Sequence, residues 1–106
     1  MPKYLITASY TTDGLKGLLK DGGSARRTAV QKAADSLGGK LETLYFAFGD
    51  HDVIAIADLP DNGTAAAFSL TVNATGAVRT TTTPLLTAEE IDAASKKSVS
   101  YRAPGA

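Results

Sequence analysis

Two apolar runs on either side of a short polar turn constrain the fold of this chain more than any other feature. The runs cover Lys40 to Phe48 and Val53 to Leu59, and residues 49–52 (Gly-Asp-His-Asp) separate them. Aromatic and β-branched residues dominate both runs, which predicts two strands joined as a hairpin. Apolar side chains fall on both faces of this hairpin, because Ile54 and Ile56 alternate with other apolar residues. Such a sheet needs a covering layer on each face.

Periodicity elsewhere predicts further strands and helices. Lys3 to Tyr10 alternates with a period of two, as a strand does, whereas the residues after Thr11 and Ser24 follow helical spacing. The chain is expected to begin with a strand at 3–10, a short helix interrupted at Gly22-Gly23, and a helix from Ser24 to a stop at Gly38-Gly39. After the hairpin we expect a helix from Asp61 to Gly76 and a strand at 78–86, with Pro84 near an edge. A short helix capped by Thr87 and Glu90 follows.

Two helical faces are expected to contact the sheet. They are Ala25 or Ala29 with Ala33 and Leu37 in the first long helix, and Ala65, Phe68 and Val72 in the second. Arg26 and Arg27 would then point to solvent.

The order of elements is that of an α+β fold, the ferredoxin-like split βαββαβ arrangement followed by a C-terminal helix. Residues 1–98 are expected to form this single domain, and residues 99–106 a loose tail. Helices cover only one sheet face in this arrangement, so the second apolar face needs another cover. A second copy of the chain related by two-fold symmetry would supply it, which predicts a homodimer or higher homo-oligomer built as a dimeric α+β barrel.

Composition excludes several classes of protein. The 106 residues contain no cysteine, so disulfides, thiolate zinc sites and a cysteine nucleophile are ruled out. Eleven basic and 11 acidic residues cancel without forming a long block of either sign, so no nucleic acid partner is expected. No segment has the length of a membrane span or the composition of a secretory signal, so we expect no membrane association and a cytoplasmic location.

Three stretches of the chain resemble one known family. They are YLITASYTTDGLKGL, RRTAVQKAADSLGGKLETLYFAFGDHDVIAIADLPD and GAVRTTTTPLLTAEE, which together extend roughly from Lys3 to Glu90. Here the chain is similar to the GYD-domain family of small bacterial and archaeal proteins. The motif after which the family is named is a glycine followed shortly by Tyr-Asp. In this chain it falls on Gly49 and Asp52, with His51 in place of the tyrosine. The resemblance implies a dimeric α+β barrel. The wider superfamily includes cofactor-free oxygenases, isomerases, dehydratases, haem-binding enzymes and proteins without known activity, so no single reaction is implied.

The turn of the hairpin holds the candidate catalytic residues, His51 and Asp52. His51 is the one histidine of the chain and the only side chain expected to titrate near neutral pH, and Asp52 is a possible proton acceptor. A structural role is the alternative, because Asp50 and Asp52 suit turns and caps and Gly49 could supply a positive φ. No metal site is predicted, because a single imidazole provides too few donors.

Tyr45, Arg79 and Thr81 are the candidate ligand-binding residues. Arg79 and Thr81 share one face of the last strand, where a guanidinium and a hydroxyl inside a barrel would orient a polar ligand. The alternative is that threonine simply favours strands at a solvated edge and that Tyr45 is a core aromatic residue.

Two functions stay open at this stage. In the first, the barrel binds a small organic ligand, and the protein is a cofactor-independent oxygenase or isomerase-type enzyme in which His51 or Asp52 accepts a proton. In the second, it is a non-catalytic dimeric or higher-oligomer protein with an interaction or structural role. No cofactor is expected, since Gly22-Gly23 lacks the preceding strand, the spacing and the lysine of a phosphate loop.

Overall fold

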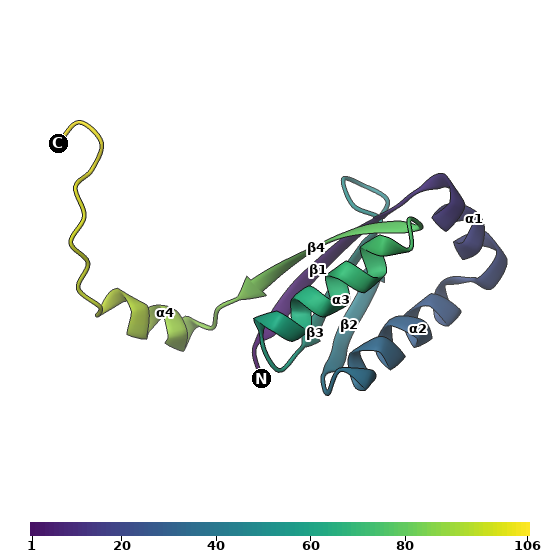
Figure 1. The fold of residues 1–106 in the computed structure, drawn as a ribbon, viewed down its shortest axis with the longest axis horizontal. Helices are drawn as coiled ribbons and strands as arrows, with labels where there is room; N and C mark the ends of the chain where they lie inside the picture. The colour runs from purple at the N-terminus through teal and green to yellow at the C-terminus, as the bar shows by residue number, and fades with distance from the viewer.

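The computed structural model describes all 106 residues and has a four-stranded antiparallel sheet with three helices on one of its faces (Figure 1). The elements in chain order are β1 (Lys3–Tyr10), α1 (Thr12–Asp21), α2 (Gly23–Ser36), β2 (Lys40–Phe46), β3 (Val53–Asp58), α3 (Asn62–Ala74), β4 (Val78–Leu85) and α4 (Ala88–Ser95). The strand order is β2-β3-β1-β4, as in ferredoxin-like sheets. The predicted α+β, ferredoxin-like fold is confirmed.

The central strand β1 connects the two halves of the sheet. It pairs with β4 along its whole length and with β3 from Lys3 to Ala8. Its alternation places Tyr4 and Ile6 under the helices, where both are buried. The Tyr4 hydroxyl donates to Asn62 Oδ1 at 2.7 Å, so a fully buried aromatic ring also fixes the start of α3.

A glycine separates α1 from α2, as the sequence predicts. Gly22 has a φ of 85°, in the left-handed region that disfavours other residues. At the other end of α1, the Thr11 hydroxyl caps the helix by accepting from Gly14 N. Gly14 itself lies against the start of β4, because a Cβ at this position would collide with the carbonyl oxygen of Ala77. The first helix is therefore held close to the last strand.

The buried face of α2 agrees with the predicted face in its second half. Ala33 and Leu37 pack against the core as predicted, together with Val30 and the buried Ala34, whereas both alanines proposed for the first turns of the helix are exposed. Arg26, which was expected in solvent, is partly buried on this same inward side. The prediction followed the spacing of alanines in the first turns and left out Val30, whose larger side chain gains more from burial.

The β2–β3 hairpin forms where it was predicted, but its turn has a different conformation. The positive φ, 56°, belongs to Phe48 and not to Gly49. This conformation is uncommon for a residue with a side chain. The Phe48 ring stacks on the ring of Phe46, with 6.3 Å between their centroids, and this contact offsets part of the conformational cost.

Polar contacts hold α3 to the strand β4 beside it. Asn73 Oδ1 accepts from the Thr80 backbone N–H at 2.7 Å, and the hydroxyls of Ser69 and Thr82 share a hydrogen bond of 2.6 Å. Asp61 caps α3 as predicted, and its hydrogen bond from the helix backbone lowers its pKa.

Both edge strands of the sheet depart from regular geometry. The pairing of β2 with β3 shifts register between Leu41 and Thr43, as at a β-bulge. At the opposite edge, β4 contains Pro84, which lies across from Tyr4 near the end of the strand. Pro84 therefore occupies the edge position that the sequence predicts.

The core consists of two unequal clusters. The larger contains Tyr4, Ile6, Ala55, Ala57, Leu59, Ala65 and Phe68, and the smaller contains Ala8, Val53 and Val78. The smaller cluster lies at the end of the sheet near α1 and has no side chain larger than valine among its buried members. The larger side chains packed against it, Tyr10, Leu44, Phe46 and Val72, are only partly buried.

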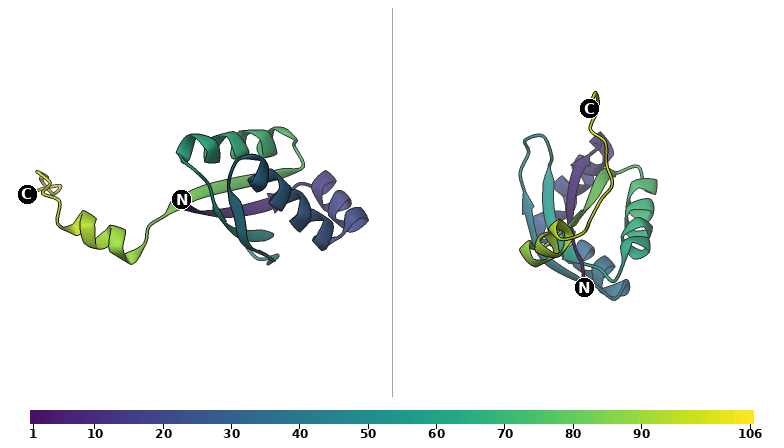
Figure 2. Two further views of the ribbon diagram at one scale, coloured as in Figure 1. Left: turned by 90° about the horizontal axis from the view of Figure 1, so that it is seen from below. Right: turned by 90° about the vertical axis from the view of Figure 1, so that its left-hand side faces the viewer.

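The face of the sheet away from the helices is uncovered in the single chain (Figure 2). We define this open face by the outward residues of the four strands, which are Leu5, Thr7, Thr43, Tyr45, Ile54, Ile56, Arg79, Thr81 and Thr83. Tyr45 is 70% exposed and Ile54 is 40% exposed. At one end, Lys3 forms ion pairs with Asp58 at 3.0 Å and Glu42 at 3.1 Å, and these hydrogen bonds raise the pKa of Lys3.

Beyond β4 the chain leaves the domain. Figures 1 and 2 show α4 and the residues after it projecting away from the sheet, and no residue of α4 is buried. The predicted capping box between Thr87 and Glu90 begins this helix. No helix of the structure combines the length and the apolar character that crossing a bilayer requires.

The packing of α3 gives the first testable prediction. Phe68 is 7% exposed within the larger cluster, so Phe68→Ala should lower the free energy of unfolding by about 3–5 kcal/mol. Leu70, on the outer side of the same helix, is 72% exposed, and Leu70→Ala should change this free energy by less than about 0.5 kcal/mol. Urea denaturation measures both variants. Equal losses would contradict the rotation of α3 described here.

Candidate functional site

The three residues proposed from the sequence as ligand contacts lie on the open face. Tyr45 pairs with Ile54, Ile54 with Thr7, and Thr7 with Thr81, so these positions form one row across all four strands. Tyr45 and Thr81 are thus three strand spacings apart, about 14 Å. The Thr81 hydroxyl is hydrogen-bonded to Thr7, and Arg79 is exposed. One face brings these residues together, but the single chain does not bring them into contact.

The two candidate catalytic residues lie at the tip of the hairpin and differ in their contacts. Asp52 Oδ2 accepts from the backbone N–H of Tyr10 at 2.8 Å, and the backbone N–H of Asp52 donates to Ala8 O at 2.8 Å. His51 is exposed, and its backbone oxygen accepts from Gly49 N at 3.1 Å. Asp52 therefore ties the hairpin to β1, whereas the His51 imidazole is free to meet a solute or a partner.

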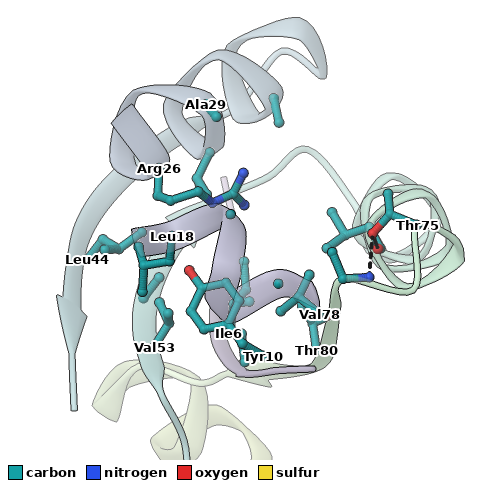
Figure 3. A pocket seen from close by; sticks show the side chains of 18 of the residues that line it. Ile6, Tyr10, Leu18, Arg26, Ala29, Leu44, Val53, Thr75, Val78 and Thr80 are labelled. Atoms are coloured by element: carbon teal, nitrogen blue, oxygen red, sulfur yellow. Dashed lines mark hydrogen bonds between the residues drawn. The ribbon is translucent and has the colours of Figure 1, made fainter. Parts of the chain in front are cut away.

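A pocket of about 410 Å³ lies on the other side of the sheet, between the strands and the helices (Figure 3). Residues from β1, β2, β3 and β4 form its floor, and α1, α2 and α3 form its walls. Of the 23 lining residues, 15 are hydrophobic, so the interior suits a largely apolar molecule. None of His51, Asp52, Tyr45, Arg79 and Thr81 lines it.

Small side chains account for this pocket. Its lining includes Ala8, Gly17, Ala29, Ala33, Ala55 and Ala77, whose small side chains leave space between helix and sheet. Gly17 is the clearest case, because a Cβ placed there would meet no atom within 4 Å. Protein interiors are normally filled to the density of organic crystals, so a gap of this size marks a departure from ordinary core packing.

Several polar groups border this apolar space. Arg26 extends into it from the first turn of α2, and its Nε is buried without a hydrogen-bond partner. Tyr10, at the end of β1, points its hydroxyl into the same space (Figure 3). Asp13 and Asp21 line the pocket from α1, and both residues are exposed. The pocket thus has an apolar interior with a cation, a phenol and two hydrated carboxylates around it.

Sequence reasoning missed this site because it placed Arg26 on the wrong side of α2. A usable signal existed, since Arg26 precedes Val30 by four residues and Ala34 by eight, which puts all three on one helical face. No group of three or more His, Cys, Asp or Glu side chains in the structure is arranged to hold a metal ion.

Comparison with models of protein families matches residues 4–95 to the GYD domain. The match covers most of the 106 residues, so the chain belongs to this family. No curated protein and no solved structure matches the chain.

The contacts of the hairpin tip predict opposite effects for its two candidate residues. Asp52→Ala removes a charge-assisted hydrogen bond to a partly buried backbone N–H and should lower the free energy of unfolding by about 1–3 kcal/mol. His51→Phe should change it by less than about 0.5 kcal/mol, because the side chain is exposed. Chemical denaturation of both variants tests this difference. A larger loss for His51→Phe would show that the imidazole, and not Asp52, braces the hairpin.

Proposed function

We propose that this GYD-domain protein binds a small, largely apolar organic molecule in the pocket between its helices and its sheet, and that it does so as a homodimer. The observation that carries the first part is the pocket itself. Its volume of about 410 Å³ lies within the usual range for ligand sites, and its lining is mostly hydrophobic with a few polar groups at defined positions.

Binding, without turnover, is the function that this pocket supports. An oxygenase or isomerase would in addition need a proton acceptor beside its substrate. His51 and Asp52, the acceptors proposed from the sequence, lie outside the pocket. A reaction inside it would have to use Tyr10, Asp13 or Asp21 instead.

The open face supports the second part of the proposal. Leu5 lies beside Ile56, and Ile54 lies beside Tyr45, so apolar side chains are contiguous across the middle of the sheet. A stable interface buries about 800 Å² on each partner, an area that a four-stranded sheet face can provide. The ends of this face differ in charge, with Arg79 at one and the Lys3, Asp58 and Glu42 group at the other. A two-fold axis running across the strands would bring these opposite ends together.

In such a dimer, Tyr45, Arg79 and Thr81 would lie between the two sheets. They would then remain candidates for contacts to a polar ligand there, as the sequence suggests. The two-sheet arrangement is also the dimeric α+β barrel that the family resemblance implies.

A matched pair of substitutions at Gly17 tests the pocket. Gly17→Ala adds one methyl group and a better helix former, and should raise the free energy of unfolding by about 1 kcal/mol. Gly17→Leu adds a side chain that enters the open space of the pocket. The neutral fluorescent probe N-phenyl-1-naphthylamine should bind the wild type and Gly17→Ala, and its binding should be lost in Gly17→Leu.

Equal probe binding by all three proteins would contradict a ligand site at this place. Native mass spectrometry of the wild type purified from its expression host should in addition show a retained small molecule. A protein that binds no probe and retains no molecule would favour the alternative, a non-catalytic interaction protein.

A charge on the open face tests the dimer. Ile54→Asp should convert a dimer to a monomer, because it places an unpaired carboxylate at the centre of the proposed interface. The control Leu70→Asp makes the same change at an exposed position on the helical side and should leave the dimer intact. Sedimentation velocity at micromolar concentration measures both. A well-folded wild-type monomer at this concentration would refute the dimer and leave the pocket proposal unaffected.

A further inference from the structure

The Arg26 side chain has a buried nitrogen that lacks a hydrogen-bond partner. Its Nε is fully buried and donates to no oxygen of the chain. Buried donors in folded proteins are nearly always hydrogen-bonded, because burial removes their bonds to water. The guanidinium is also without an ion pair, since both ion pairs of the structure are formed by Lys3. Arg26 therefore carries an unneutralised charge at the wall of an apolar pocket.

The geometry of a guanidinium defines what its remaining donors fit. The two terminal Nη atoms each hold an N–H that points outward in parallel with the other, and together these donors match the two oxygens of a carboxylate. A neutral hydroxyl or a water molecule satisfies only one of these donors. The guanidinium without an ion pair thus favours a planar oxyanion over a single polar atom.

Tyr10 adds a second donor on the same side of the pocket. Its ring stands on the sheet and its hydroxyl points into the space that Arg26 enters from α2 (Figure 3). The backbone N–H of Tyr10 is bound by Asp52, which holds the residue in place, while its hydroxyl forms no hydrogen bond within the chain. A phenol so placed can donate to an oxyanion.

The other charges around the pocket do not cancel this preference. Asp13 and Asp21 are exposed on α1, so water screens them, and neither lies within ion-pair distance of Arg26. Electrostatic interactions with the buried edge of Arg26 are screened less.

We propose that the pocket is selective for a carboxylic acid with an apolar body of about the size of naphthalene, its carboxylate held by Arg26 with Tyr10 as an additional donor. The mostly hydrophobic lining would enclose the body and the terminal nitrogens of the Arg26 guanidinium would bind the head. This inference rests on the proposed function, because it names the class of molecule that the same pocket takes.

Three probes of one size separate the contribution of charge from that of the apolar body. They are 2-naphthoate, 2-naphthylmethanol and 2-naphthylmethylamine, each titrated into the wild-type protein by displacement of N-phenyl-1-naphthylamine. The carboxylate should bind about tenfold or more tightly than the alcohol, the difference expected for a charge-assisted pair of hydrogen bonds. Equal affinities for acid and alcohol, or tightest binding of the amine, would overturn the proposal.

The neighbouring arginine supplies a matched control. Arg26→Met keeps an apolar stem of similar length and should reduce the affinity for 2-naphthoate to that of the alcohol, whereas the alcohol itself should bind as before. Arg27→Met removes the same charge from an exposed position and should change neither affinity by more than about twofold. Equal losses of 2-naphthoate binding in the two variants would indicate a general charge effect and contradict the Arg26 contact.

If Arg26→Met fails to fold, Arg26→Lys tests the contact between Arg26 and the carboxylate. It keeps the charge but lacks the parallel donors, so it should retain only part of the preference for the acid. An unchanged preference in Arg26→Lys would overturn the two-donor contact. Failure of the fluorescent probe to bind the wild type would instead refute the pocket as a ligand site, so the two proposals fail by different results.

Discussion

The position of β1 in the middle of the sheet is the constraint on which the rest of the structure depends. The first strand pairs with both β3 and β4, so segments far apart in the sequence must come together before the four-stranded sheet is complete. The alternation of β1 then divides the protein into two sides. Tyr4, Ile6, Ala8 and Tyr10 face the helices, and the intervening residues form the centre of the open face. The pocket lies on the first side, and the face available to a second copy of the chain is the other.

On the helical side, the space between helices and sheet is filled at one end and partly empty at the other, because the side chains differ in volume. Around Phe68 and Leu59, aromatic and aliphatic groups fill the space beneath α3. Around Ala8, the sheet and the helices carry small residues, while the backbone geometry at Gly14 keeps α1 fixed against β4. A space lined by Arg26 persists there without a side chain of the protein to occupy it.

Most of the fold follows from the sequence because its signals are local. Strand alternation, the break at Gly22 and the caps at Asp61 and Thr87 each depend on a few adjacent residues, and each appears where it was expected. The inward side of the first turns of α2 was mispredicted because it depends on which side chains find space on a sheet assembled from distant segments. The pocket could not be predicted for the same reason, since a cavity is a property of several elements packed together. The site residues proposed from the hairpin motif stay hypotheses.

The irregular edges of the sheet bear on how this protein avoids uncontrolled assembly. Unpaired edge strands are templates to which another chain can add a strand, and natural sheets block this addition with bulges, charges and proline. Here the bulge in β2 lies between Leu41 and Thr43, at the charged Glu42, and β4 carries Pro84. Addition of further strands by backbone hydrogen bonds is therefore disfavoured at both edges of the sheet. In the proposed dimer, association would instead use side chains on a surface of limited extent, which one partner saturates, and such an assembly would be closed and finite rather than fibrous.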